Sequence, residues 1–218
     1  MCSIIWDWNG TLLNDLDLCV STINILLEKR GLPLLDRKSY KAVFSFPVKD
    51  YYEAVGFDFS KEDFAIPAKE FIDIYNSNVE KCALHLPAKK VLSHFKSKGI
   101  KQFVLSAMKQ DMLEKTLKHN AIYSFFEGVA GLNDHYAVSK IERGNQLIKE
   151  FEIQRKNTWM IGDTIHDFEV AEELGIKCIL VADGHQSTER LETTSALVIS
   201  EISQLITNEI LFFDNTGN

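Results

Sequence analysis

The stretch Ser3-Ile4-Ile5-Trp6-Asp7-Trp8-Asn9-Gly10-Thr11 joins an apolar run to a polar turn near the start of the chain. A short apolar run that ends in turn residues is typical of a buried strand rather than of a helix. The carboxylate of Asp7, the amide of Asn9 and the hydroxyl of Thr11 would then lie at the carboxyl end of that strand. This stretch therefore predicts a sheet whose first strand leads into a group of reactive polar side chains.

Beyond Pro87 the chain alternates between predicted strands and predicted helices. The strands are expected at residues 100–106, near Val129, and at 158–161, 176–181 and 197–199; the helices are expected at 88–98, 110–119, 139–151, 165–174 and after 199. Strands separated by helices of roughly 10 to 15 residues indicate a parallel sheet with helices on its faces. The predicted fold class is therefore α/β, with a Rossmann-like, doubly wound parallel sheet.

The long segment before Pro87 lacks a convincing strand and predicts helices only. Asn14 is the expected N-cap of a first helix that closes at Lys29-Arg30-Gly31. Further helices are expected at 37–44, at 48–55 and from Ser60, where Ser60-Lys61-Glu62-Asp63 resembles a capping box. We therefore expect a core of residues 1–13 and 86–218 and an inserted all-helical domain of residues 14–85.

Composition and charge narrow the function classes. The 218 residues are 45% hydrophobic and 25% charged, which is typical of a globular protein. A formal net charge of −7 argues against nucleic acid as a partner, because binding to its phosphates rests on clustered Lys and Arg. The cysteines form no C-x-x-C pair, the histidines form no recognisable ligand spacing, and no signal peptide or transmembrane stretch is found. We expect a cytoplasmic protein that binds neither nucleic acid nor membranes; the sequence does not predict its oligomeric state.

Polar residues also follow other predicted strands at the point where those strands end. Ser106 ends the second strand, Lys140 precedes a helix, and Asp163 and Asp167 follow the strand at 158–161. Ligands of such sheets bind at the carboxyl ends of the strands. Carboxylates brought together repel one another unless a cation holds them, and Mg²⁺ binds one or two carboxylates together with water and substrate phosphate. The grouping therefore indicates a Mg²⁺ site that handles phosphate.

Lys140 carries a separate signal. Ser139-Lys140-Ile141-Glu142 is typical of a capping box with Ser139 at the N-cap, which places Lys140 at the first helical position. The positive end of the helix dipole disfavours a cation there by ~0.3–1 kcal/mol. We therefore expect Lys140 to face carboxylates or a phosphate.

These residues together resemble the four motifs of the haloacid dehalogenase superfamily. The motifs are carried by Asp7-Trp8-Asn9-Gly10-Thr11, Ser106, Lys140 and Gly162-Asp163-Thr164-Ile165-His166-Asp167. The helical segment of residues 14–85 resembles the helical cap of the phosphoglycolate phosphatase-like branch. The resemblance implies a Mg²⁺-dependent phosphohydrolase in which Asp7 attacks phosphorus and forms an aspartyl-phosphate that water later hydrolyses.

The resemblance also implies a role for each motif residue. The catalytic residues would be Asp7, Asn9 and Lys140. Mg²⁺ would be held by the carboxylates of Asp7 and Asp163 and by the backbone oxygen of Asn9, and Asp167 would support this metal shell.

A small phosphorylated metabolite is the implied substrate. Thr11, Ser106 and Ala107 would bind its phosphoryl group. Phe46 and Lys49, with Phe44 and Ser45 beside them in the cap loop, would face the remainder of the molecule. His166 is expected to point to solvent.

Asn9 departs from the family pattern. The family's phosphatases carry an Asp there as general acid and base, and an amide cannot transfer a proton near pH 7. Asn9 predicts a slow phosphatase, a substrate with a good leaving group, or a different reaction, and Asn9→Asp is expected to raise turnover of alkyl phosphates by up to ~10²–10⁴-fold. The alternatives are a reaction similar to that of phosphonoacetaldehyde hydrolases, with Lys49 as the Schiff-base residue, and a non-catalytic, phosphate-binding regulatory protein.

Overall fold

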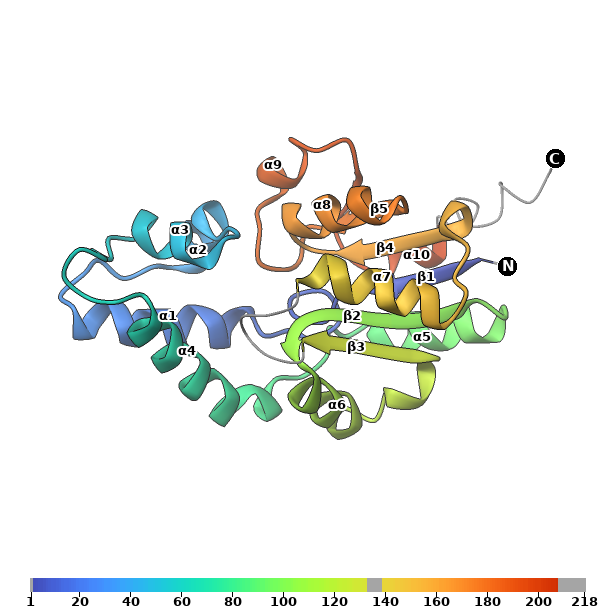
Figure 1. Cartoon of the computed structure of the whole chain (residues 1–218), viewed down its shortest axis with the longest axis horizontal. Coiled ribbons are helices and arrows are strands. Elements are labelled where there is room, and N and C mark those ends of the chain that lie inside the picture. Colours follow the sequence, from blue (N-terminus) through green and yellow to red (C-terminus); the bar gives the residue numbers. More distant parts are fainter. Residues whose placement is uncertain (1, 133–138, 208–218) are drawn as a thin grey trace.

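The computed structural model describes residues 2–132 and 139–207 and contains a six-stranded sheet (Figure 1). The strands are β1 (Ser3–Trp6), β2 (Lys101–Lys109), β3 (Gly128–Leu132), β4 (Thr158–Gly162), β5 (Lys177–Val181) and β6 (Leu197–Ile199). Their order is β3-β2-β1-β4-β5-β6, and every neighbouring pair is parallel. This is the strand order of doubly wound Rossmann sheets, so the predicted fold class is confirmed.

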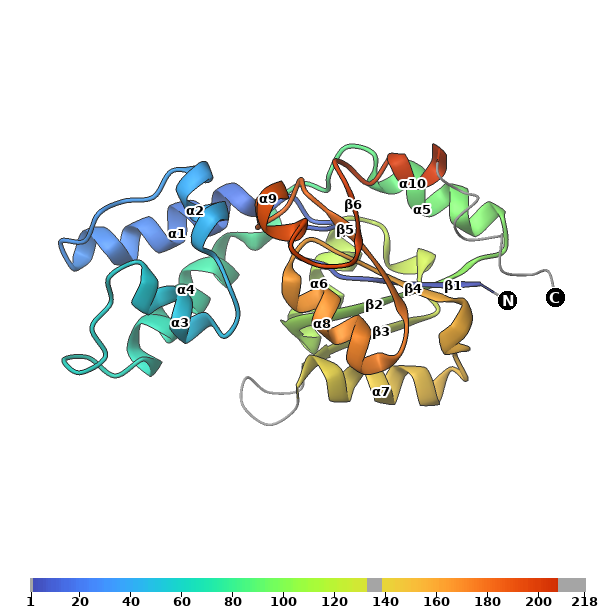
Figure 2. The same ribbon diagram turned by 90° about the horizontal axis from the view of Figure 1, so that it is seen from above.

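Helices cover both faces of the sheet (Figure 2). One face packs against α5 (Ala88–Ser97) and α6 (Gln110–His119), and the other against α7 (Lys140–Glu150) and α8 (Ile165–Leu174). In β1, Ile4 and Trp6 belong to the first of these cores and Ile5 to the second, because successive side chains of a strand point to opposite faces. The apolar run thus forms the buried central strand that its pattern predicts. Two short helices, α9 (Thr188–Leu191) and α10 (Gln204–Thr207), complete this part.

The remaining helices lie beyond the end of the sheet at which β1 leads toward α1, as both views show (Figures 1 and 2). They are α1 (Leu16–Lys29), α2 (Arg37–Val43), α3 (Val48–Ala54) and α4 (Ala65–Asn78). The chain enters and leaves this helical segment through two connections that run side by side. Leu13 and Leu84 form an antiparallel bridge, and the Asn14 N–H donates to the carbonyl of Ala83 at 2.9 Å.

Some predicted boundaries are wrong. α1 begins at Leu16 with Asp15 as its N-cap residue, because Asn14 is engaged in the connection described above. α4 begins at Ala65 rather than at Ser60, because the carboxylate of Asp58 accepts hydrogen bonds from the N–H and hydroxyl of Ser60 and holds it in a turn.

The sheet and the chain ends also differ in detail from the predicted pattern. β2 continues to residue 109, past the expected end at 106, with a shift of register in its last residues. α9 was not expected from the sequence, and the tail at 212–218 lies outside the described residues. None of the helices in the described ranges combines the length and apolarity that a membrane span requires.

Candidate active site

The carboxyl ends of β1 and β4 place Asp7 and Asp163 next to each other. The Asp7 N–H donates to the carbonyl of Ile161, at the end of β4, over 2.8 Å. Lys140 reaches the same point from the start of α7, where its Nζ lies 2.5 Å from Oδ1 of Asp7 and 2.6 Å from Oδ1 of Asp167. All four charged side chains are buried. The structure therefore assembles three carboxylates and one ammonium group from three separate segments of the sequence.

Two helix starts hold this cluster in place. At α7, Ser139 Oγ accepts the N–H of Glu142 and the Glu142 carboxylate accepts the N–H of Ser139, so the predicted capping box is confirmed and Lys140 is the first helical residue. At α8, Oδ2 of Asp167 accepts the N–H of Thr164 at 3.0 Å and its hydroxyl at 2.7 Å. Asp167 thus fixes both the ammonium group of Lys140 and the loop that carries Asp163.

Two glycines let the backbone approach Asp163. A Cβ atom on Gly10 would lie 2.3 Å from Oδ2 of Asp163, and one on Gly184 would lie 2.1 Å from the same oxygen. Gly10 also has a φ of +74°, which residues with a side chain rarely adopt. This close approach allows the N–H of His185 to donate to Oδ2 of Asp163 at 2.6 Å.

The residues predicted to bind the phosphoryl group differ in the hydrogen bonds that their side chains already make. Thr11 Oγ1 donates to Oδ1 of Asp163 at 2.9 Å, so it already has a strong acceptor. Ser106 Oγ lies 3.5 Å from Oδ1 of Asn9, which is at the limit of a hydrogen bond. Ala107 follows it in β2 and is exposed. The Ser106 hydroxyl is thus the more readily available donor.

The charges of the cluster are unevenly balanced. Burial raises the pKa of Asp7 to about 8, with Asp167 and Asp163 adding to this effect and Lys140 opposing it. Burial also raises the pKa of Asp163 to about 6. For Asp167, Lys140 and the Thr164 hydroxyl outweigh burial and lower the pKa. One ammonium group does not compensate three buried carboxylates, so the cluster favours an additional cation.

The donor set fits Mg²⁺. Carboxylate oxygens of Asp7, Asp163 and Asp167 all lie within 4.8 Å of one another, and Mg²⁺ prefers carboxylate oxygen. Both oxygens of Asp167 already accept short hydrogen bonds, whereas Oδ2 of Asp7 faces the Thr11 hydroxyl only at 3.5 Å. Asp7 therefore has the most free acceptor capacity, whereas both oxygens of Asp163 already accept hydrogen bonds, from Thr11 and from the His185 N–H, and would share them with an ion.

A second buried group, which sequence reasoning missed, surrounds Asp15. Its Oδ1 accepts the N–H of Gly10 at 2.8 Å and lies 3.2 Å from Nε2 of His185, while its Oδ2 accepts from the Tyr75 hydroxyl at 2.6 Å. In the sequence Asp15 lies in the expected first turn of a helix, where acids are common, and no local pattern distinguishes Tyr75. His185 offered one usable signal, because it follows the end of a predicted strand.

The cap-loop aromatic residues reach the core beside this cluster. The ring of Phe46 packs on that of His166 at a centroid distance of 4.8 Å, and the ring of Phe44 lies 5.3 Å from that of His185. The expectation that His166 points to solvent is correct only in part, because its ring packs against Phe46 while 26% of its side chain is exposed. Ser45 lies between the two phenylalanines and is half-buried.

Lys49 is not brought to the strand ends. It is exposed, its Nζ lies 5.8 Å from the ring centroid of Phe59, and it lines a separate pocket with residues 59–64. A Schiff-base lysine would have to reach a substrate held near Asp7. This placement therefore gives no support to the phosphonoacetaldehyde hydrolase-like alternative.

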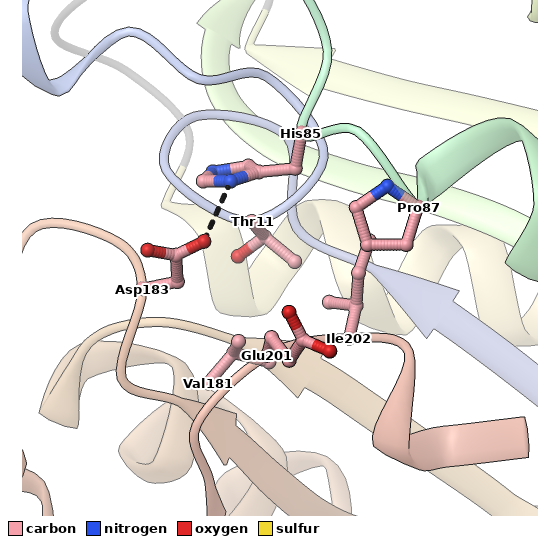
Figure 3. Close-up of a pocket in the computed structure, with 7 residues that line it drawn as sticks. All are labelled: Thr11, His85, Pro87, Val181, Asp183, Glu201 and Ile202. Atoms are coloured by element: carbon pink, nitrogen blue, oxygen red, sulfur yellow. Dashed lines mark ion pairs between the residues drawn. The ribbon is translucent and has the colours of Figure 1, made fainter. Parts of the chain in front are cut away.

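A small pocket lies beside Thr11 (Figure 3). In it, Nδ1 of His85 lies 3.0 Å from a carboxylate oxygen of Asp183, and Nε2 of the same ring lies 3.0 Å from the carbonyl oxygen of Gly10. The other lining residues are Pro87, Val181, Glu201 and Ile202. The pocket adjoins the glycine turn and does not include the carboxylate cluster.

A family model described as haloacid dehalogenase-like hydrolase matches residues 4–181, from β1 to the end of β5. The chain belongs to this family. The matched range contains every strand-end residue of the carboxylate cluster, so the resemblance seen in the motifs is confirmed.

Solved structures and a curated relative are similar to this haloacid dehalogenase-like hydrolase over most of its length. A haloacid dehalogenase-like family hydrolase from Streptococcus pneumoniae has a TM-score of 0.81 at 17% identity, covering 96% of this chain and 98% of that one. A predicted phosphatase from Clostridium acetobutylicum also has a TM-score of 0.81, at 18% identity, covering 97% and 99%. The tyrosine-protein kinase PtkA of Mycobacterium tuberculosis is 21% identical over 203 residues, which are 93% of this chain and 69% of that protein. At these identities the solved structures show a shared fold.

Proposed function

We propose that this haloacid dehalogenase-like hydrolase is a Mg²⁺-dependent phosphohydrolase that acts on a small phosphorylated metabolite through an aspartyl-phosphate on Asp7. The observation that carries the proposal is the buried Asp7 carboxylate, with Lys140 at 2.5 Å and Asp163 beside it, at the carboxyl ends of the central strands. Residues 14–85 would act as a cap over a core of residues 1–13 and 86–218.

Asp7 is arranged as a nucleophile. Lys140 holds its Oδ1, so that Oδ2, which has only the long contact to Thr11, is free to attack phosphorus. As the bond from Oδ2 to phosphorus forms, the bond from phosphorus to the leaving oxygen breaks, and water later cleaves the aspartyl-phosphate. Lys140 would also compensate charge on the phosphoryl oxygens, and Ser106 would donate a hydrogen bond to one of them.

The metal site follows from the same donor set. The carboxylates of Asp7 and Asp163, with the backbone oxygen of Asn9, would hold Mg²⁺, which when bound screens the negative charge of Asp7 from that of the phosphoryl group. Asp167 contributes by holding Lys140 and the loop before α8.

Transfer of the phosphoryl group to an acceptor other than water is a second candidate activity. Asn9 is compatible with it, because an amide cannot take a proton from water when the aspartyl-phosphate is hydrolysed, whereas an acceptor that is already deprotonated needs no such base. The mycobacterial relatives named as tyrosine-protein kinases make this worth a separate assay.

A release assay tests the main proposal. Phosphate release would be followed with acetyl phosphate, an aryl phosphate, phosphoglycolate and sugar phosphates, with Mg²⁺ and with a chelator. We expect Mg²⁺-dependent release and a hydroxylamine-labile phosphoryl label on Asp7 in acid-quenched enzyme. A label that persists and moves to tyrosine-containing peptides would favour the transferase. Binding of phosphate without release or label would favour the regulatory alternative.

A further inference from the structure

Asn9 has its amide nitrogen turned away from the carboxylate cluster. Nδ2 of Asn9 donates to Oδ2 of Asp15 at 2.8 Å and to the hydroxyl of Tyr75 at 2.6 Å. The opposite end of the amide, Oδ1, lies 3.5 Å from the hydroxyl of Ser106. The reverse orientation would set two acceptor oxygens, those of the amide and the carboxylate, against each other. The surroundings therefore fix which end of Asn9 faces Ser106.

Tyr75 completes this arrangement from α4. Its hydroxyl has a single hydrogen, which it donates to Oδ2 of Asp15, so toward Asn9 it can only accept. Its ring is stacked on Phe71, with 6.0 Å between the centroids, and is buried. The amide of Asn9 is thus held by two side chains of the helical segment.

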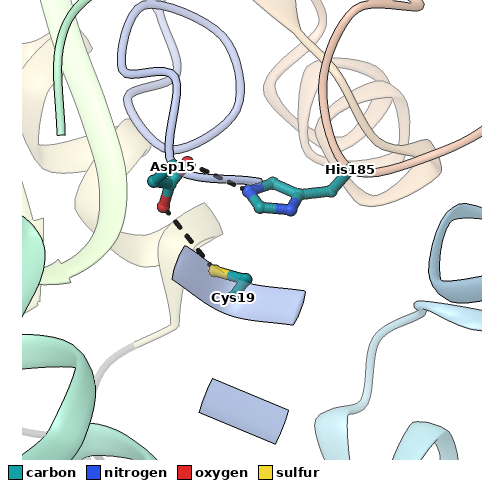
Figure 4. A group of neighbouring side chains, drawn as sticks. All are labelled: Asp15, Cys19 and His185. Atoms are coloured by element: carbon teal, nitrogen blue, oxygen red, sulfur yellow. Dashed lines mark hydrogen bonds and ion pairs between the residues drawn. The ribbon is translucent and has the colours of Figure 1, made fainter. Parts of the chain in front are cut away.

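Asp15 needs no metal ion to compensate its negative charge. A carboxylate oxygen of Asp15, the sulfur of Cys19 and a ring nitrogen of His185 lie within 4.8 Å of one another, which is a spacing that metal ligands can have (Figure 4). However, the carboxylate already accepts from the Gly10 N–H, the Asn9 amide and the Tyr75 hydroxyl, and it pairs with His185. The group is a closed hydrogen-bond network.

We infer that Asp15 and Tyr75 are positioning residues that hold Asn9 as a fixed hydrogen-bond acceptor, so that the site cleaves phosphoryl bonds to leaving groups that depart without a donated proton. This inference rests on the proposed function. In the reaction, the bond between phosphorus and the leaving oxygen breaks while Asp7 forms its own bond to phosphorus, and the leaving oxygen keeps the electron pair. Aryl and acyl phosphates have such leaving groups, and alkyl phosphates do not.

The network also determines what a carboxylate at position 9 would face. In Asn9→Asp a new carboxylate oxygen would stand against Oδ2 of Asp15, at the place of an amide that lies at 2.8 Å. At this separation the two carboxylates would repel each other, and the hydrogen bonds that the Asn9 amide donates to Asp15 and Tyr75 would be lost. We therefore expect Asn9→Asp to need the second change, Asp15→Asn, before it gains on alkyl phosphates.

The decisive experiment exchanges the amide of Asn9 and the carboxylate of Asp15. Asn9→Asp, Asp15→Asn and the double exchange would be compared by urea unfolding and by kcat/KM across aryl and alkyl phosphates with leaving groups of graded basicity. We expect the wild type to depend steeply on the leaving group, and Asn9→Asp to unfold at lower urea without a gain on alkyl phosphates. The exchange should recover part of the unfolding midpoint, since His185 still lacks the Asp15 anion, and should gain about 10²-fold on alkyl phosphates. Mass spectrometry must first confirm Asn9, since an Asn before Gly deamidates readily.

Three outcomes would overturn the inference: a gain on alkyl phosphates in Asn9→Asp equal to that of the exchange, strictly additive unfolding effects of the two substitutions, or a wild type indifferent to the leaving group. The unfolding comparison needs no substrate. If the wild type releases no phosphate from any compound, the proposed function fails, while the coupling between positions 9 and 15 is still decided.

A milder pair of variants tests Tyr75. Tyr75→Phe removes a hydroxyl that bonds Asp15 and Asn9, and Tyr51→Phe is its control, because the buried hydroxyl of Tyr51 has no hydrogen-bond partner among the described residues. We expect Tyr75→Phe to lower kcat several-fold with little change in KM, and Tyr51→Phe to leave both constants unchanged. Equal effects of the two variants would remove Tyr75 from the positioning role.

Discussion

Asp7 and Asp15 flank the same turn and are both buried, yet the pKa values of their carboxyl groups are shifted in opposite directions. Burial raises the pKa of Asp7 to about 8. Burial acts in the same direction on Asp15, but His185, Tyr75 and Asn9 outweigh it and lower the pKa of Asp15 to about 2. The difference is one of partners, since Asp15 has a donor on each oxygen and Asp7 shares one lysine with Asp167. A buried carboxylate short of partners is suited to receive a cation or a substrate.

Neutralising Asp7 should have the largest effect on the activity of the protein. Asp7→Asn should lower phosphate release by at least ~10³-fold, because it removes the nucleophile. It should leave the free energy of unfolding unchanged or higher, since it also removes repulsion with Asp163 and Asp167. Release of phosphate from acetyl phosphate and urea unfolding would measure the two effects. Asp73→Asn, an exposed substitution on α4, is the control and should change neither quantity.

Asp15→Asn, unlike Asp7→Asn, should lower the free energy of unfolding. It leaves the buried His185 without its anion, and removing one member of a buried ion pair typically costs about 3–5 kcal/mol of stability. Urea unfolding at pH 7, beside Asp7→Asn, provides the measurement. A stability equal to that of the wild type would show that the pair is not held in solution.

The same contrast shows what the sequence could and could not predict. The order of strands and helices, the capping box before Lys140 and the placing of Asp7, Asp163 and Asp167 at strand ends follow from local patterns and from the rule for parallel sheets. These features need no knowledge of long-range packing. The family resemblance then supplied the expected roles.

The network around Asp15 could not be predicted in this way. Tyr75 and His185 come from α4 and from the loop after β5. The strand end before His185 is the one local signal, and it does not show that this residue or Tyr75 contacts the turn that carries Asn9. The position of Lys49 was equally hidden, because the packing of α3 against residue 59 decides where its side chain lies. The helical segment is thus the region in which sequence reasoning was least informative.

Metal binding should stabilise the protein through the strand-end carboxylates. If Mg²⁺ binds at Asp7 and Asp163, an excess of about 100 times its dissociation constant should stabilise the protein by about 2.7 kcal/mol. Asp163→Asn should abolish this increment, and Asp73→Asn should retain it. The difference between unfolding midpoints with Mg²⁺ and with a chelator gives the result. An increment that survives in Asp163→Asn would place the ion elsewhere.

The smallest expected effect belongs to the contact between the proposed cap and the core. Phe46 packs on His166, at the start of α8 and close to Asp167 in the sequence, and an aromatic pair of this kind contributes about 0.5–1.5 kcal/mol. Because this contact forms only where the helical segment meets the core, Phe46→Ala should raise KM several-fold with little change in kcat. Ile66→Ala, which truncates an exposed apolar side chain on α4, is the matched control and should leave KM unchanged. A fall in kcat equal to the rise in KM would instead place Phe46 against the reacting groups. Phe46 would then belong to the catalytic site rather than to a cap that closes over the substrate.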